Sequence, residues 1–235
     1  MHDFLQAFRL AVDLILGADA DLLEVIGLSL RVSLTALAVS GLIGFPLGAV
    51  AGIFRFPGRG LIAVLMNALM GLPPVVVGLV VYFAFSRRGP FGWLDLLYSP
   101  TAMIVAQTIL VTPIIAALSR QVVEDLNREY AEQFRSFCVP PARAVRALLW
   151  DARYSLLTVA LAGFGRAIAE VGAVIIVGGN IDHYTRVMTT AIALETSKGE
   201  LAFALALGLV LLAIALAVNA AVMGLRGTAA RHAYA

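Results

Sequence analysis

Charged residues are scarce in this chain: Asp, Glu, Lys and Arg make up 14% of its 235 residues, where a soluble domain usually carries about a quarter. Cysteine is nearly absent as well. The single Cys138 excludes an internal disulfide and a cysteine-cluster metal site. What is abundant is apolar sequence, since hydrophobic residues make up 61% of the chain. This composition indicates a membrane protein.

Five apolar runs are long enough to cross a bilayer, which needs about 20 mostly apolar residues. Only one of them contains charges, Arg166 and Glu170. The runs are 32–54, 61–86, 96–119, 156–177 and 201–225. Strands are not expected, because the pattern does not alternate and an open sheet edge is unsatisfied in lipid. We therefore predict a single-domain (1–235), all-α integral membrane protein with five transmembrane helices.

An amphipathic helix is predicted at residues 3–17, before the first span. Its apolar and polar side chains fall on opposite helix faces, Phe4, Phe8, Val12 and Ile15 against Gln6, Arg9 and Asp13. This pattern favours a helix that lies in the membrane interface. A short sixth span is the alternative, and the charges of Arg9 and Asp13 argue against it.

Basic residues concentrate on one side of the five spans, the side expected to face the cytoplasm. They lie in the 54–60 turn, the 120–153 segment and the tail, and are Arg55, Arg59, Arg120, Arg128, Arg135, Arg143, Arg146, Arg153, Arg226 and Arg231. The N-terminal flank is acidic and is placed outside. The N-terminus is thus predicted to be extracytoplasmic and the C-terminus cytoplasmic. Arg87 and Arg88 fall outside, against the rule.

Prolines and glycines interrupt several of these helices. Pro46 and the pair Pro73-Pro74 each remove a backbone donor and should kink or break their spans. Such breaks occur either where helices pack or where they line a pore, because backbone groups that lose their helical hydrogen bond need protein or water as a partner. Gly178-Gly179 should end the fourth span. A short helix around 187–194, which dips into the outer leaflet, is expected after it.

The segment 120–153 is the one long polar stretch on the cytoplasmic side. Leu126, Tyr130, Phe134 and Phe137 recur at helical steps and form an apolar stripe. Pro140-Pro141 interrupts the helix and favours a new helix start. The pattern predicts a helix–turn–helix that leaves the membrane and returns, the shape of a docking element.

This segment resembles the EAA coupling loop of ABC importer permeases, which docks on an ATP-binding subunit. Glu132-Gln133-Phe134 fill the first positions of the motif, Cys138 stands where glycine is expected, and Asp151 replaces the final proline. By this resemblance, the docking residues are Tyr130, Glu132, Phe134, Arg135, Phe137, Cys138 and Pro140.

Two further regions are similar to molybdate and tungstate permeases: 71–78 in the second span and 163–173 in the fourth. The region 178–196 is more similar to the tungstate type. The resemblance implies a bacterial cytoplasmic-membrane permease that imports an oxyanion, with tungstate preferred. Molybdate, sulfate or another solute on the same fold is the alternative.

The resemblance also implies the partners. Two copies of the chain would form the pore, two ATP-binding subunits would bind inside, and a solute-binding protein would deliver the anion outside. No cofactor is expected on this chain, and ATP and Mg would be used by the partner subunit. The sequence agrees, because it has no G-x-x-x-x-G-K-[ST] phosphate-binding loop. No metal site and no nucleic-acid partner are expected.

Residues near the breaks are the candidates for the pore and its outer gate, because their donors can bind an anion weakly. They are Pro73, Pro74, Gly178, Gly179, Asn180, Thr185, Arg186, Thr189 and Thr190. Arg166 and Glu170, four residues apart, should form an intramembrane ion pair. We favour a structural pair over direct contact with the substrate.

An intramembrane enzyme is the remote alternative. Such hydrolysis needs an activated nucleophile or a metal site. His2, His183 and His232 lie outside the predicted spans, and no H-E-x-x-H motif occurs. The sequence therefore favours a transporter subunit over an enzyme.

Overall fold

A computed structural model describes residues 8–10, 12–13, 15–17 and 19–233. Within these residues the chain is helical and contains no strand, as predicted. The elements are α2 (Ala20–Ile53), α3 (Arg59–Met70), α4 (Pro74–Phe85), η1 (Gly92–Leu94), α5 (Pro100–Ser136), α6 (Pro141–Ile168), α7 (Gly172–Gly178), α8 (Met188–Lys198) and α9 (Leu201–Ala233). Residues 3–7, 11 and 14 of the predicted amphipathic helix lie outside the described residues. The described residues 8–10, 12–13 and 15–16 are helical.

The first span is longer than the sequence predicted, since α2 begins at Ala20 rather than at Val32. Asp19 starts the helix, because its carboxylate accepts a hydrogen bond of 3.1 Å from the Leu22 N–H. The helix also continues through Pro46 without a break. It packs most extensively against α5, and this contact holds the helix together where proline removes one bond.

The third span and the first half of the docking segment form a single helix, α5. Its 37 residues correspond to about 55 Å at 1.5 Å per residue, against about 30 Å for a hydrocarbon core. Ser99 caps its outer end through the Ala102 N–H. One continuous helix thus joins the end of the molecule at Ser99 to the α5–α6 turn.

Two spans are bent pairs of helices. α3 and α4 meet at 98° across Gly71–Pro73, where the prolines predicted a break, and α6 and α7 meet at 55°. The second bend was not predicted, since no proline marks it. Among the described residues, three helices are long and apolar enough to cross a membrane alone, or five spans if each bent pair counts as one. The predicted number of spans is consistent with this arrangement.

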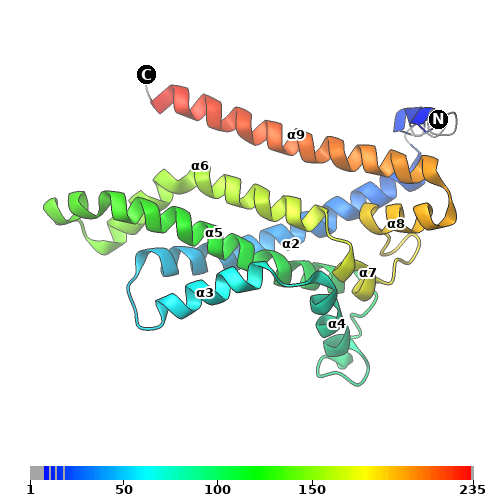
Figure 1. Ribbon diagram of the computed structural model, residues 1–235, viewed down its shortest axis with the longest axis horizontal. Helices are drawn as coiled ribbons and strands as arrows, with labels where there is room; N and C mark the ends of the chain where they lie inside the picture. The colour runs from blue at the N-terminus through cyan, green and yellow to red at the C-terminus, as the bar shows by residue number, and fades with distance from the viewer. Residues whose placement is uncertain (1–7, 11, 14, 18, 234–235) are drawn as a thin grey trace.

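The elements form an elongated molecule with distinct ends (Figure 1). The α5–α6 turn lies at one end, and α7 and α8 lie at the other. α9 runs along one side, and α4 projects from the body. α7 ends at Gly178, where Gly179 adopts a φ of +69°, as the Gly-Gly pair predicted. The short helix expected near 187–194 is α8.

Candidate functional site

The turn between α5 and α6, called the tip below, is held by contacts between the two helices. Pro141 is the first residue of α6, as the sequence predicted. The hydroxyl of Tyr130 on α5 donates to the carboxylate of Asp151 on α6 at 2.7 Å, and its ring contacts that of Phe134. Beyond this clasp, Glu132, Arg135 and Cys138 are exposed and Phe137 is 78% exposed. An exposed aromatic ring beside charged side chains suits a protein contact.

Cys138 occupies the sharpest part of this turn. Its φ is +47°, in the left-handed region that glycine adopts without steric cost. Glycine, the residue expected here from the resemblance to the EAA motif, would suit this backbone conformation. Cys138 is also exposed, so its side chain is not needed for packing.

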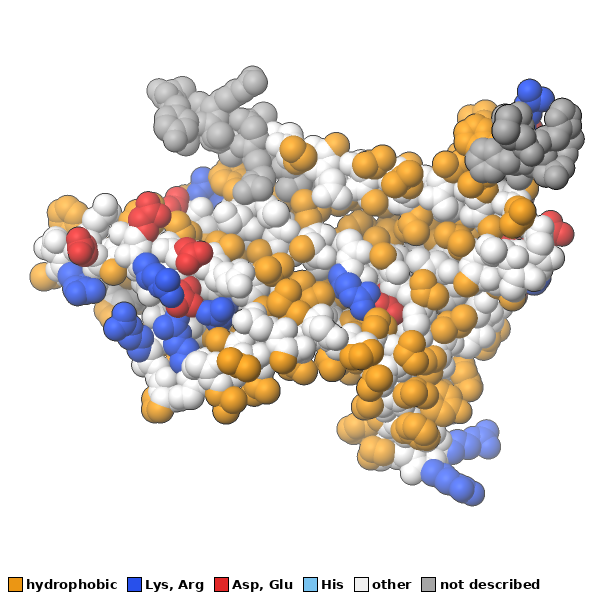
Figure 2. All heavy atoms as spheres, viewed as in Figure 1, with side chains coloured by type: hydrophobic (Ala, Val, Ile, Leu, Met, Phe, Trp, Pro, Cys, Tyr) orange, Lys and Arg blue, Asp and Glu red, His pale blue; other side chains and the backbone are white. Residues whose placement is uncertain are grey.

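A cluster of charges connects α2, α3 and α5 near the start of α3. Glu124 on α5 forms ion pairs with Arg59 on α3 (3.2 Å), with Arg128 (2.6 Å) and with Arg120. Arg59 also donates to the Ala51 carbonyl at 2.6 Å, at the end of α2. Figure 2 shows basic and acidic side chains gathered at this end. The cluster links the tip to the spans.

The break in the fourth span is held by polar side chains from three directions. Arg166, in the last turn of α6, pairs with Glu170, whose other oxygen accepts from the Ala173 N–H of α7 at 3.0 Å. Each charge therefore faces the helix end of opposite partial charge. From α5, the Gln107 amide donates to the Ala167 carbonyl at 3.1 Å. Glu170 is only 3% exposed, which agrees with a structural pair.

The predicted gate residues lie together beyond this break. The Thr185 hydroxyl donates to the Gly178 carbonyl at 2.6 Å, and the Thr189 hydroxyl donates to the Glu170 carbonyl at 2.8 Å. The Asn180 amide approaches the Thr190 carbonyl at 3.4 Å. All three threonines are buried. Their hydroxyls shape the backbone around Gly178-Gly179 in this conformation.

The two broken spans pack against each other. A Cβ on Gly78 of α4 would lie 2.9 Å from the Ala173 Cα of α7, so these helices touch along their backbones. Gly172, at the start of α7, faces Val75 just after Pro73-Pro74 in the same way. The structure thus brings the second-span prolines next to the fourth-span break. It places the docking residues at the opposite end of the molecule (Figure 1).

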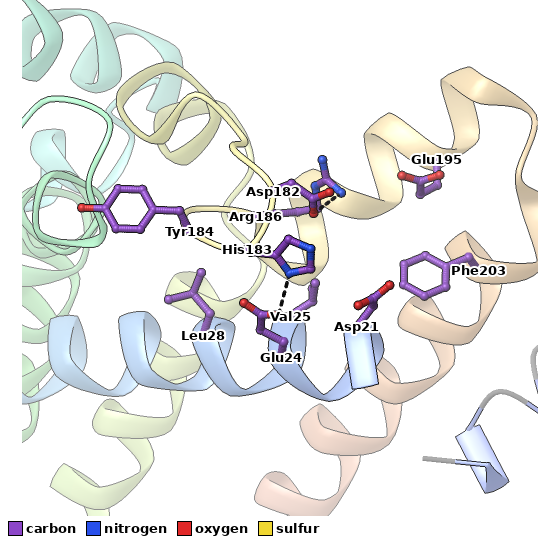
Figure 3. A pocket seen from close by; sticks show the side chains of 10 residues that line it. All are labelled: Asp21, Glu24, Val25, Leu28, Asp182, His183, Tyr184, Arg186, Glu195 and Phe203. Carbon is purple, nitrogen blue, oxygen red and sulfur yellow. Dashed lines mark hydrogen bonds and ion pairs between the residues drawn. The ribbon is translucent and has the colours of Figure 1, made fainter. Parts of the chain in front are cut away.

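A pocket of about 220 Å³ opens at the outer end, between α2, the α7–α8 loop and α8 (Figure 3). Its lining includes four carboxylates, two basic or titratable side chains and apolar residues: Asp21, Glu24, Asp182, Glu195, Arg186, His183, Val25, Leu28, Tyr184 and Phe203. Arg186 pairs with Asp182 at 2.6 Å. The charge of this pocket is therefore predominantly acidic.

His183 bridges two parts of this pocket, because its Nδ1 lies 2.8 Å from a carboxylate oxygen of Glu24 on α2. This hydrogen bond raises the pKa of His183 above its ordinary value, and the charges of Glu24, Asp182 and Asp21 raise it further against a small opposing effect of burial. The bridge joins residues 159 positions apart.

Sequence reasoning missed three of these features: the 169–171 break, the Glu124 cluster and the outer pocket. An acidic side chain just before a helix often binds its first N–H groups, so Glu170 beside Gly172 carried a weak signal of a new helix. The other two features unite residues from distant segments. No local pattern indicates which of the many arginines meets Glu124.

Comparison with known proteins agrees with this architecture. Residues 44–226 match the model of the family described as binding-protein-dependent transport system inner membrane component. The chain is 40% identical to the tungstate uptake system permease TupB of Peptoclostridium acidaminophilum, over 96% of this chain and 99% of that protein. It is 38% identical to TupB of Campylobacter jejuni, over 90% and 89%.

A third relative is a probable anion ABC transporter permease of Haloferax volcanii, which is 41% identical over 85% of this chain and 88% of its own length. These relatives are transporter subunits and not enzymes. The family match covers most of the chain, including the broken spans and the α5–α6 turn. The chain belongs to the family of binding-protein-dependent inner membrane transport components, as a multi-pass ABC transporter permease.

Proposed function

We propose that this permease forms the pore of a tungstate importer, as two copies joined by two ATP-binding subunits and an extracytoplasmic binding protein. ATP and Mg are used by the ATP-binding subunits, which dock at the α5–α6 turn. The tungstate assignment is supported by the two TupB relatives. The orientation puts the α5–α6 turn and the C-terminus in the cytoplasm, in agreement with the basic residues around Glu124.

The observation that carries the mechanism is the continuity of α5. The same helix bears the docking tip, Glu124 at the membrane surface and Gln107 against the break of the fourth span. A displacement of the tip by the ATP-binding subunits therefore moves a group that binds the Ala167 carbonyl beside the break. The two states of the pore differ, on this proposal, in the bend between α6 and α7.

The outer gate is proposed to consist of Asn180, Thr185, Arg186, Thr189 and Thr190 around Gly178-Gly179, with Pro73-Pro74 beside it. Because the threonine hydroxyls already donate to carbonyls, we assign them the shaping of the gate, and we assign the weak anion contacts to backbone N–H groups. Thr189→Val should therefore change the uptake rate more than the ion preference. An unchanged rate would remove Thr189 from the gate.

The test is vesicle uptake of tungstate, molybdate and sulfate with ATP, after co-expression with the ATP-binding and binding-protein subunits. We expect ATP-dependent uptake with tungstate first. Glu132→Lys at the exposed tip should abolish it, whereas Asp125→Lys, exposed on the same helix but distant from the turn, should retain it. Uptake that ranks sulfate or molybdate first would change the cargo and keep the fold. Uptake without ATP would contradict the importer itself.

A further inference from the structure

We propose that α4 is an arm that packs onto the second copy of the chain, with Arg87 and Arg88 at its far end meeting that copy's acidic outer pocket. This inference rests on the proposed function, which requires two copies. It adds the surface through which they associate.

The arm has one face for its own chain and one without a partner. Val77, Val81 and Phe85 are buried against the body. The opposite face carries a helical stripe of exposed apolar side chains, Val76, Leu79, Val80 and Phe83, each at least 43% exposed. In Figure 2 the arm projects as a column of hydrophobic side chains with basic groups at its far end. Such a stripe has the spacing of a helix–helix contact.

The bend between α3 and α4 at the base of the arm, called the elbow below, has backbone groups that lipid alone would leave without hydrogen bonds. Gly71 and Pro73 are exposed and non-helical, and neither Pro73 nor Pro74 has an N–H. α3 has 12 residues, so the elbow lies at most about 18 Å from the cytoplasmic start of α3, inside a core of about 30 Å. Irregular backbone at that depth is tolerated only against protein or a water-filled cavity. A second copy on this face supplies both surroundings: its own protein surface, and the water-filled pore between the two copies.

The charges at the far end of the arm also lack an ion-pair partner among the described residues of their own chain. Arg87 and Arg88 are exposed and form no ion pair within the described residues. Two basic residues on the outer side also violate the usual charge distribution of membrane proteins. An acidic surface on a neighbour accounts for both observations.

The outer pocket supplies such a surface. It presents Asp21, Glu24 and Asp182, all exposed, with a fourth carboxylate deeper in the pocket. In Figure 3 the Asp21 and Glu24 carboxylates rise from α2 toward the α7–α8 loop. Asp182 and Glu195 already pair with Arg186 and Lys198, which leaves Asp21 and the exposed Glu24 beside His183 as the carboxylates that complement the two arginines.

The arm and the pocket lie at matching depths. Tyr98, which contacts Tyr82 of the arm, donates its N–H to the Val177 carbonyl at the end of α7, and the pocket loop follows α7 directly. Within one chain the arm points away from α8 (Figure 1). A two-fold axis along the membrane normal preserves depth, so it can bring the arm of one copy to the pocket of the other.

Photocrosslinking tests the surface directly. A benzophenone amino acid replaces Val80, which is 62% exposed, and another replaces Leu212 on α9, which is 56% exposed, in membranes that contain the complete transporter. Position 80 should give an adduct of two permease chains, and position 212 should not. An adduct at position 80 with lipid only, in membranes that still take up the oxyanion with ATP, would overturn the arm and leave the proposed function intact.

Charge exchange tests the receiving pocket. Arg87→Glu with Arg88→Glu should lower the position-80 adduct about tenfold, because close charge pairs contribute strongly to association. Asp21→Arg with Glu24→Arg should lower it likewise. All four changes in one chain should restore the adduct. If the combined variant stays as low as either pair, the pocket is not the partner of the arm.

Discussion

The two ends of this permease are built in opposite ways. At the end that contains the α5–α6 turn, α2 and α5 are long and unbroken, and the charges around Glu124 join them to the start of α3. At the outer end, α4, α7 and α8 are short pieces of 7–12 residues. The segments that follow α4 and α7 contain non-glycine residues of positive φ, which are Tyr98 before α5, and Asn180 and His183 before α8. One end is thus built on long continuous helices, and the other consists of short helices separated by turns.

The difference shows where movement is absorbed. Continuous helices transmit a displacement only if they do not slide past each other. A gate, in contrast, must change its conformation. Close backbone contact between α2 and α5 and the Glu124 cluster serve the first requirement. The hydrogen bonds of Glu170, Thr185 and Thr189 hold the backbone around the fourth-span break, within residues 170–189, and we propose that they are exchanged for others when the gate opens. Variants at the two ends should therefore fail differently.

Among these variants, Gly48→Ala should have the largest effect on stability, through the packing of α2 against α5. A Cβ at this position of α2 would lie 2.6 Å from the Ala116 carbonyl oxygen and 2.9 Å from the Arg120 nitrogen of α5, so the helices must separate. We expect a loss of about 3 kcal/mol in the free energy of unfolding, measured by thermal or denaturant unfolding of the purified chain.

Gly27→Ala on the same helix is the matched control, because nothing lies within 4 Å of its Cβ. It should leave stability equal or raise it by about 0.5–1 kcal/mol through helix propensity. Equal losses at both positions would show that the contact between α2 and α5 does not depend on close approach.

Glu124→Gln should weaken the same end by less. It removes the charge shared by Arg59, Arg120 and Arg128 while it keeps the side-chain volume. We expect a loss of about 2 kcal/mol, since partly buried charged hydrogen bonds are lost, together with slower ATP-dependent uptake. Glu129→Gln, exposed on the same helix, should change neither quantity. A full uptake rate in Glu124→Gln would exclude the cluster from coupling.

Asp19→Ala should produce a smaller loss at the outer end. It removes the acceptor for the Leu22 N–H, which caps α2, and helix caps contribute about 1 kcal/mol. Asp19→Asn keeps the acceptor and should retain most of the stability. If both variants lose the same amount, the negative charge of Asp19, rather than its hydrogen bond, stabilises this end.

The sequence predicted the elements that local chemistry determines. Pro73-Pro74 broke the second span, Gly178-Gly179 ended the fourth, and Pro141 began α6, because these residues restrict the backbone wherever they occur. The docking residues were assigned by resemblance, and the exposed tip agrees with that role without testing it.

Tertiary contacts decided the remainder. Pro46 does not break α2, because Gly44 and Gly48 hold that helix against α5. The fourth span breaks without proline, since Glu170 binds both Arg166 and the Ala173 N–H. The early start of α2 was not predicted, because the acidic residues there were interpreted as a flank outside the membrane. Pairs far apart in sequence, such as His183 and Glu24, leave no periodic signal.

The smallest predicted effect is a pH dependence of stability, caused by the bridge between α2 and the α7–α8 loop. The pKa of His183 is raised in the folded protein, chiefly by its hydrogen bond to Glu24 and by the charges of Glu24, Asp182 and Asp21. The protonated bridge therefore stabilises the fold fully below the unfolded pKa of about 6.5, and this contribution is lost as the pH rises through the folded pKa. Arg186 and Glu195 also face the pocket.

We expect the melting temperature to fall slightly more between about pH 6 and about pH 8 in the native chain than in His183→Gln, in line with the one titrating group removed. Glu24→Gln should flatten the dependence as well, because it removes the main cause of the raised pKa. The Glu124 cluster is distant from this pocket, so Glu124→Gln should keep the native pH profile at a lower melting temperature. An identical profile in all three variants would show that the bridge between α2 and the α7–α8 loop contributes nothing to the stability of the outer end.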